Sequence, residues 1–396
     1  MTEQEKEKAA FFKQYAHAAD KWTLEKIWQA KQSQATRLYL FREKSLKDIS
    51  PLKDLTDLQQ LDVSYTQVSD LSPLKNLTAL QQLDFSNTQV SDISPLKDLT
   101  DLQTLYFFST PVRDISPLKN LTALRMLWLN DTRVSDISPL KDLKGLQRLH
   151  VHSLQLSDIS PLKDLMDLQV LYVYNTQVSD LSPLTNLTAL QELNVNNTQV
   201  SDLTPLKNLT ALQVLNVGYT QAHDISPLKD LTALQRLYIS KTQVSDISPL
   251  KNLTDLQEFS IDTTQVSDIS LLKDLTALQR LWIDKTPVCD ISPLKDLTAL
   301  QQLDVSSTPV HDISPLKDLM TLQLLVLNNT QVSDLSPLKG LIEKGIEVIW
   351  ADWDGSHGIF IKDTPLSNPP IEIAKQGNKA ILRYWEEQES LNFTHP

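Results

Sequence analysis

The stretch PLKDLTDLQQLDVSYTQVSDLS, from Pro51 to Ser72, is one copy of a unit that recurs along most of the chain. Its proline returns every 22 residues as far as Pro337, and at the single gap Leu271 stands in the expected place. The 14 registers contain no insertion or deletion. A fixed period between about 20 and 50 residues is the sequence signature of a solenoid, in which each repeat packs on its neighbours.

The apolar residues of this unit indicate its local structure. They are Leu52, Leu55, Leu58, Leu61, Val63, Val68 and Leu71. Steps of three residues are typical of a helical or 3₁₀ turn, whereas the two-residue step from Leu61 to Val63 is typical of a strand. Ser50 before Pro51 indicates a serine N-cap with proline in the first helical position. We therefore expect one short strand, one loop and one short helical segment in each unit.

These spacings resemble the leucine-rich repeat, LxxLxxLxLxx(N)xL, in its 22-residue, internalin-like bacterial form, and the resemblance covers residues 36–341. It implies an α/β repeat fold, a curved leucine-rich-repeat solenoid with a parallel β-sheet on its concave face. The usual loop asparagine of the family is replaced by threonine, as at Thr66 and Thr88, with Leu154 as the exception. A threonine hydroxyl can still bond the loop backbone, so the expected fold stands.

Both ends of such a stack expose apolar edges that need caps. Residues 1–35 are expected to form a helical N-terminal cap, with helix over residues 5–32, and residues 342–364 a β/α C-terminal cap. Within the C-terminal cap, GIEVIWADWDG and GIFIKD have the pattern of strands. Leu38 and Leu40 begin an irregular first strand, whose loop is one residue longer than the others.

Charge and cysteine content narrow the class of partner and the compartment. The net charge is −12 and the pI is near 5.1, which disfavours nucleic acid and anionic membranes as partners. Cys289 is the single cysteine, so a disulfide framework within the chain is excluded. The sequence contains neither the apolar core of a signal peptide nor an apolar run long enough to span a membrane. We therefore expect a cytoplasmic protein.

The copies within the chain differ from one another at only a few positions. Aspartate fills the position of Asp48 in all 14 copies, which predicts that its carboxylate caps the backbone near each helical turn. Variation concentrates around the strand, where Asp62 lies between the two inward-facing residues Leu61 and Val63. Because successive strand residues point to opposite faces, the Asp62 position and its outer neighbours are expected on the concave, solvent-facing surface.

Aromatic residues and histidines gather at these variable positions on four consecutive predicted strands. The predicted partner-binding residues are Tyr106, Phe108, Trp128, His150, His152, Tyr172 and Tyr174, with a smaller group of Arg236, Tyr238, Arg280 and Trp282. Exposed aromatics and arginines on a rigid surface are typical anchors of protein interfaces. These residues therefore predict a protein or peptide ligand on the concave face. Under the alternative interpretation, they are scattered surface aromatics without a function.

Rival chemistry has weaker support in the sequence. His150 and His152 place two imidazoles on one face of a strand, and with Asp131 or Tyr172 they offer an alternative metal site. Two ligands are a weak signal, so no metal is predicted. Motifs of the forms GxxxxGK[ST], GxSxG, HExxH and CxxC are missing from the sequence. We accordingly predict a chain that is not an enzyme and carries no catalytic residue and no cofactor.

The tail, residues 365–396, departs from the repeat. It resembles the segment that joins leucine-rich repeats to the GTPase domain in bacterial Roco proteins. The matching residues are Pro365-Leu366, Pro369-Pro370, Glu372-Ile373, Gly377, Ala380-Ile381 and Tyr384. A linker helix over about 371–388 is expected, weakened in the middle by Gly377. The leading hypothesis is a non-catalytic protein-interaction scaffold. The alternative is the sensor half of a Roco-like GTPase or other signalling protein, with a GTPase or signalling domain as its partner.

Overall fold

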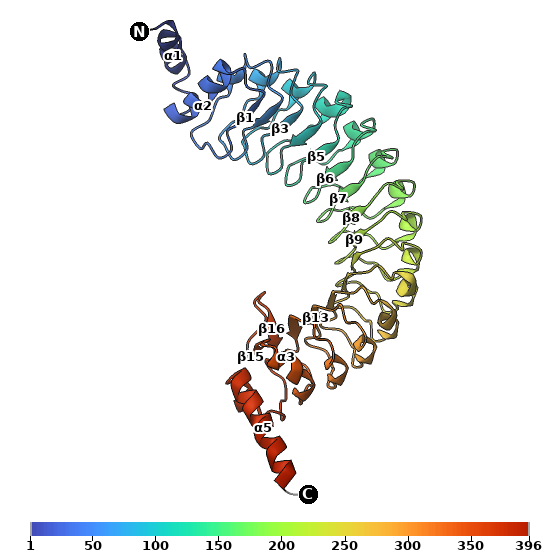
Figure 1. The fold of residues 1–396 in the computed structure, drawn as a ribbon. Coiled ribbons are helices and arrows are strands. Elements are labelled where there is room, and N and C mark those ends of the chain that lie inside the picture. Colours follow the sequence, from blue (N-terminus) through green and yellow to red (C-terminus); the bar gives the residue numbers. More distant parts are fainter. Residues whose placement is uncertain (1, 395–396) are drawn as a thin grey trace. The chain divides into compact units, whose positions relative to one another are not determined.

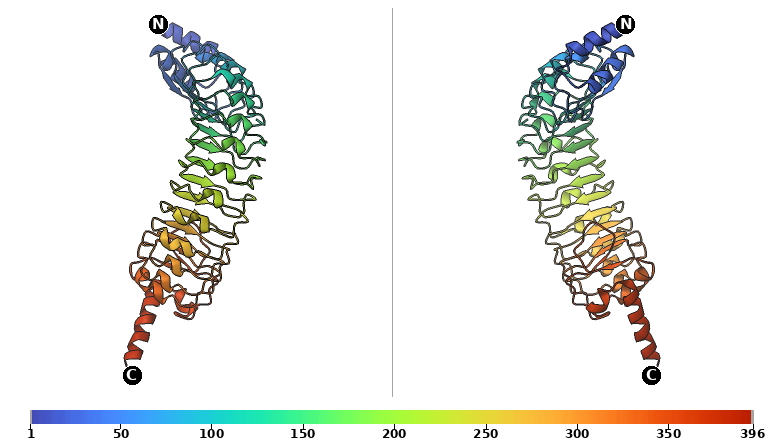
Figure 2. Two further views of the ribbon diagram at one scale, coloured as in Figure 1. Left: turned by 90° about the vertical axis from the view of Figure 1, so that its right-hand side faces the viewer. Right: turned by 90° about the vertical axis from the view of Figure 1, so that its left-hand side faces the viewer.

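The structure is a computed structural model that describes residues 2–394. It divides into two compact units, Met1–Gln199 and Val200–Pro396. Each unit is considered by itself below. In both units the strands lie along one face and the helical turns along the opposite face (Figure 1), and neighbouring strands run side by side (Figure 2).

Two helices, α1 (Glu3–Gln14) and α2 (Lys21–Gln32), precede the first strand of unit 1. The sequence predicted a single helix over residues 5–32, and the structure corrects this. The helix is interrupted because Asp20 starts a new one, its side chain accepting the backbone N–H of Thr23 at 2.8 Å.

The described residues of unit 1 form eight three-residue strands, all parallel to their neighbours. They are β1 (Arg37–Tyr39), β2 (Gln60–Asp62), β3 (Gln82–Asp84), β4 (Thr104–Tyr106), β5 (Met126–Trp128), β6 (Arg148–His150), β7 (Val170–Tyr172) and β8 (Glu192–Asn194). Leu61 pairs with Leu83, an offset of 22 residues, whereas Leu38 pairs with Leu61, an offset of 23. The longer first loop predicted from the sequence is therefore confirmed.

A 3₁₀ turn lies between successive strands in unit 1, as the three-residue steps predicted. The turns are Ser50–Leu52, Ser72–Leu74, Ser94–Leu96, Ser116–Asn120, Ser138–Leu140, Ser160–Leu162 and Ser182–Leu184. The leucines of strand and turn point inward, so that Leu61 and Leu74 are almost completely buried. These side chains form a continuous apolar core between the sheet and the row of 3₁₀ turns.

Unit 2 continues the same pattern with six strands in register and seven turns. The strands are β9 (Val214–Asn216), β10 (Arg236–Tyr238), β11 (Glu258–Ser260), β12 (Arg280–Trp282), β13 (Gln302–Asp304) and β14 (Leu324–Val326). The turns are Thr204–Leu206, Ser226–Leu228, Ser248–Asn252, Ser270–Asp274, Ser292–Leu294, Ser314–Leu316 and Ser336–Leu338. The predicted fold class, a leucine-rich-repeat solenoid with a parallel sheet, is confirmed.

The last strands of unit 2 depart from chain order. Helix α3 (Lys339–Glu343) is followed by β15 (Val348–Ile349) and β16 (Gly358–Phe360). Strand β16 pairs with β14 on one side and with β15 on the other, so the later strand lies between the two earlier ones. Both strands predicted in the segments GIEVIWADWDG and GIFIKD are present.

The predicted C-terminal helix is divided in two, α4 (Ile371–Ala374) and α5 (Asn378–Thr394). The break falls at Gly377, whose backbone φ of +83° belongs to the left-handed region that glycine adopts without strain. Within residues 2–394, neither these helices nor any other is both long enough and apolar enough to cross a membrane.

The recurrent aspartate bonds the backbone at the start of each turn, as the sequence predicted. In all 14 repeats its carboxylate accepts the backbone N–H of the residue two positions later, at 2.7–2.8 Å. The hydrogen bonds from Ser226 hold the pKa of Asp224 below its ordinary value. The predicted serine N-cap is wrong, because Ile49 caps the first turn without a side-chain bond. Ser50 instead donates its hydroxyl to Asp48 at 2.7 Å.

The loop threonine replaces the usual asparagine by bonding a backbone carbonyl. The hydroxyl of Thr66 donates to the carbonyl of Val63 at 2.6 Å, and that of Thr176 donates to Val173 at 2.7 Å. Both threonines are buried, so the carbonyl would otherwise be shut off from water. This bond satisfies an acceptor within the loop of the repeat.

Replacing Thr176 by valine tests the importance of this bond. Thr176→Val keeps the shape of the side chain but leaves the buried Val173 carbonyl without its donor. We expect a loss of about 1–2 kcal/mol of stability, measured by urea or thermal unfolding. The exposed Thr188 offers a matched control. An equal effect of Thr188→Val would contradict the explanation.

Candidate functional site

Pairing in register brings the variable residues together on the strand face, the surface formed by the side chains at the Asp62 position and its outer neighbours. Leu61 and Val63 are buried, whereas Asp62 between them is partly exposed. Across unit 1, each residue at this position is the direct partner of its counterpart on the next strand, as for Tyr106 and Trp128. The alternation predicted around Asp62 is confirmed, whereas its outer neighbour Ser64, expected to face solvent, is buried.

Four rings on consecutive strands form what we term the aromatic ladder, consisting of Tyr106, Trp128, His150 and Tyr172. The ring centroids are separated by 4.8 Å, 4.4 Å and 4.4 Å in that order. Trp128 and His150 are almost parallel, with an interplanar angle of 9°. Parallel strands lie about 4.8 Å apart, so rings in register are held close to stacking distance by the backbone itself.

A second row of rings lies beside the ladder, two residues further along the strands. His152 and Tyr174 stack with centroids 4.0 Å apart, and the Tyr174 hydroxyl lies 3.2 Å from Nε2 of His152. The ring centroids of His150 and His152 are 6.3 Å apart. Phe108 is half-buried at the equivalent position following β4. The structure thus brings the predicted residues of unit 1 together on one face.

The burial of these rings differs from the sequence expectation. His150 is only 9% exposed, and Trp128 and Tyr172 are half-buried. The sequence predicted solvent-facing side chains. The structure corrects this, because Trp128 stacks on His150 and the tilted rings of Tyr106 and Tyr172 pack against the two sides of that pair. The ladder therefore offers mainly ring edges to its surroundings.

Two polar atoms within the ladder are buried without a hydrogen-bond partner in the described part of the chain. They are Nε1 of Trp128 and Nε2 of His150. An unsatisfied buried donor or acceptor costs about 1–3 kcal/mol. The stack therefore includes a local cost that an apolar side chain at either position would avoid.

Burial also keeps the imidazoles of this region neutral. It lowers the pKa of His150 to about 4, assisted by the neighbouring His152 and Arg148. Burial likewise lowers the pKa of His152, against the opposing effect of Asp131. Residues 2–394 include no group of three or more histidine, cysteine, aspartate or glutamate side chains positioned to hold a metal ion. The alternative metal site at the two histidines thus gains no support from the geometry.

Tyrosines at the Asp62 position make a recurrent bond that the sequence analysis missed. Tyr172 donates its hydroxyl to Oε2 of Glu192 at 2.7 Å, and Tyr238 donates to Glu258 at 2.5 Å. In each pair the acceptor lies 20 residues later, two positions short of the period and therefore diagonally across to the next strand. The sequence does contain the signal, because a 22-residue period places residues that are 20 apart diagonally across neighbouring strands.

In unit 2, Glu258 joins two of the predicted binding residues. Its carboxylate accepts the hydroxyl of Tyr238 and also a guanidinium N–H of Arg280 at 2.6 Å. Burial, with the bond to Glu258, raises the pKa of Tyr238. Arg236 is exposed at the start of the strand that carries Tyr238, and Trp282 follows on β12.

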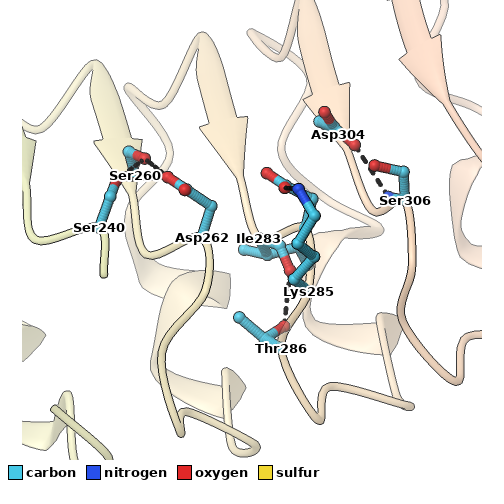
Figure 3. Close-up of polar contacts among 9 residues, drawn as sticks. Ser240, Ser260, Asp262, Ile283, Lys285, Thr286, Asp304 and Ser306 are labelled. Atoms are coloured by element: carbon cyan, nitrogen blue, oxygen red, sulfur yellow. Dashed lines mark hydrogen bonds and ion pairs between the residues drawn. The ribbon is translucent and has the colours of Figure 1, made fainter. Parts of the chain in front are cut away.

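Unit 2 also carries acidic residues, with Asp262 after β11 and Asp304 in β13 (Figure 3). Oδ1 of Asp262 accepts the hydroxyls of both Ser240 and Ser260, whereas Asp304 accepts the backbone N–H of Ser306 at 2.8 Å. Asp304 is 7% exposed, and burial raises its pKa to about 6.

Comparison with known proteins identifies the family. The family described as Leucine Rich repeats (2 copies) matches residues 78–120, 122–164, 167–208, 188–230 and 232–273. A solved internalin from Listeria monocytogenes is 32% identical, with a TM-score of 0.66, and the match covers 82% of this chain and 93% of the internalin. The chain belongs to the leucine-rich-repeat family. The predicted similarity to internalins is confirmed.

Other leucine-rich-repeat structures share the fold at lower identity. A Leptospira interrogans protein of this family has a TM-score of 0.69 at 21% identity, covering 72% of this chain and 76% of its own. The plant peptide hormone receptor RGFR1, solved in complex with RGF2, has a TM-score of 0.63 at 18% identity, covering 84% and 64%. No curated protein matches the sequence. The resemblance of residues 365–396 to a Roco linker remains a prediction.

The lowered pKa of His150 predicts a pH dependence of stability in this leucine-rich-repeat protein. As the pH falls below the ordinary histidine value of 6.5, the unfolded chain binds a proton that folded His150 refuses until about pH 4. Stability present above pH 6.5 is therefore lost towards pH 4, by about 3 kcal/mol at most.

His150→Phe keeps a ring in the stack and removes the titration. Urea unfolding of this variant at pH 7.5 and pH 4.5 is expected to show a smaller acid loss than in the wild type. His311→Phe, at an exposed histidine, provides the control. An unchanged acid loss in His150→Phe would show that His150 is not held neutral by burial.

Proposed function

We propose that this leucine-rich-repeat protein is a non-catalytic scaffold that binds a protein or peptide partner on its strand face, the concave face of the predicted solenoid. The aromatic ladder is the main anchor, with Phe108, His152 and Tyr174 beside it. Arg236, Tyr238, Arg280 and Trp282 form a second contact region in unit 2. Leucine-rich-repeat proteins are generally scaffolds for protein interaction, which supports the proposal.

The observation that carries the proposal is the aromatic ladder with its unpaired buried nitrogens. A strand face selected for stability alone would avoid the cost of Nε1 of Trp128 and Nε2 of His150. Functional surfaces are where such costs are commonly retained. A position that is aspartate in β2 and β3 becomes aromatic on four consecutive strands, while the capping framework stays constant.

The geometry of the rings favours a polypeptide over other ligands. Sugars and nucleobases bind aromatic side chains by stacking on a ring face. In the ladder the faces of Trp128 and His150 are covered by their neighbours at 4.4–4.8 Å. Ring edges and hydroxyls suit the mixed polar and apolar surface of a protein. The receptor RGFR1 shares this fold and was solved in complex with RGF2, which supports binding on such a scaffold.

A ladder variant tests the proposal. Trp128→Ala combined with Tyr172→Ala removes two of the four rings of the ladder. The control, Met166→Ala, removes an exposed apolar side chain from the segment after a 3₁₀ turn. Affinity capture from an extract and medium of the source organism, followed by mass spectrometry, compares the two with the wild type. We expect a partner that the wild type and Met166→Ala retain and the ladder variant loses.

With the purified partner, the loss of affinity should reach about 2 kcal/mol, or roughly 30-fold. Circular dichroism and thermal unfolding are needed alongside, because removing stacked rings lowers stability to some extent. A folded ladder variant that keeps every partner of the wild type contradicts the proposal.

A second candidate function, the sensor half of a Roco-like GTPase, is favoured by one observation at the C-terminal end. Asn378, the first residue of α5, accepts the backbone N–H of Val348 in β15 at 2.9 Å and donates to the carbonyl of Ile346 at 2.8 Å. Such bonds would couple α5 to the sheet. The coding sequence after codon 396 tests this function, since a G-domain region there supports it and unrelated sequence contradicts it.

A further inference from the structure

A cavity of about 480 Å³ in unit 2 is lined by both tryptophan and aspartate side chains. It opens on the strand face, between β11–β14 and the loop that follows β15. Its walls include Trp282, Trp353, Asp262, Asp284, Asp304 and Asp352. The ladder in unit 1 and the Glu258 bonds do not involve these carboxylates.

Cations compensate only two of the four carboxylates in this cavity. Lys285 in the lining lies 3.2 Å from Asp284, and Lys362 outside the lining pairs with Asp352 at 2.6 Å. Among the described residues, Asp262 and Asp304 have no cation partner. Asp304 is bonded to Ser306 and packed beside Asp284, so burial and that neighbour act together to raise its pKa to about 6. Burial and the charge of Asp262 also raise the pKa of Asp284. A cation entering the cavity would therefore be attracted mainly by Asp262 and Asp304, the two carboxylates without a cation partner among the described residues.

The two tryptophans provide an independent indication of the ligand. Trp353 is 40% exposed in the loop after β15, and its Nε1 donates to the carbonyl of Ser356 at 3.0 Å. Asn328 holds the same loop by donating to the carbonyl of Ala351 at 3.0 Å. Indole faces attract organic cations, whereas a metal ion requires a shell of oxygen, nitrogen or sulfur ligands. The described residues place no such shell here.

We propose that this cavity accepts the arginine side chain of a partner polypeptide. A guanidinium is planar and stacks on indole, and its fork of N–H groups matches a carboxylate such as that of Asp304. A lysine ammonium is more strongly hydrated and has no plane to stack. Delivery of the arginine by a polypeptide rests on the proposed function, whereas the recognition of the guanidinium is a property of the cavity.

The test uses the full chain and N-acetyl-arginine amide as the probe, with binding followed by saturation-transfer NMR and calorimetry. N-acetyl-citrulline amide has nearly the same shape without the charge and serves as the ligand control. We expect a dissociation constant on the order of millimolar for the arginine probe. Citrulline should bind at least about tenfold more weakly, because it cannot form a charge-assisted bond.

Matched variants locate the binding. Asp304→Asn and Trp353→Ala should each weaken arginine binding about tenfold or more. Asp318→Asn and Trp22→Ala, at exposed positions outside the cavity, should leave it unchanged. Thermal unfolding checks that each variant is folded. Because Trp353 is exposed, Trp353→Ala is expected to have little effect on the stability of the fold. Equal binding of arginine and citrulline, or normal binding by folded Trp353→Ala, overturns the proposal.

Two further outcomes separate this proposal from others. Equal or tighter binding of N-acetyl-lysine amide overturns the assignment to arginine, and tight calcium binding that excludes the arginine probe overturns the assignment to an organic cation. The ladder variant with Trp128 and Tyr172 replaced by alanine should bind the probe normally. If the arginine probe does not bind but the ladder variant still loses its partner, only the proposal for the cavity is overturned. If the probe binds but the ladder variant keeps every partner, only the proposal for the ladder is overturned.

Discussion

The structure depends on parallel pairing of three-residue strands, at an offset of 22 residues between the regular repeats of each unit. A strand of this length has little stability alone, and only the stack gives it neighbours and a shared core. The same pairing dictates what the surface can become. Because equivalent residues lie one strand spacing apart, a column of rings is placed near 4.4–4.8 Å without any further device.

Two side-chain bonds per repeat leave the strand face free to vary. The recurrent aspartate satisfies a backbone N–H at each turn, and the loop threonine satisfies a backbone carbonyl, as Asp70 and Thr66 do. Neither bond uses a strand-face position. Leu154 shows that one loop can lack the hydroxyl while the stack continues. Specificity can therefore change at the Asp62 position without altering the backbone that carries it.

The period in the sequence was enough to predict the strands, the turns and the face on which Trp128 and His150 lie, because all of these follow from alternation and register. The burial of His150 could not be predicted, since it depends on how rings from adjacent strands cover one another. The interruptions within the terminal helices could not be predicted from the apolar spacing either. Asp20 and Gly377 each interrupt a helix whose apolar spacing continues through the break, so a cap bond and a left-handed backbone overrode the periodicity.

Burial on the strand face acts on two titratable groups with opposite consequences. His150 in unit 1 loses affinity for its proton, so the ladder is neutral and presents ring edges. Asp304 in unit 2 gains affinity for its proton, so its charged form becomes costly unless a cation arrives. One backbone design thus supports an uncharged, aromatic surface and an acidic cavity that favours a cation. The difference arises wholly from residues at variable positions, which is where a repeat scaffold can acquire specificity without endangering its fold.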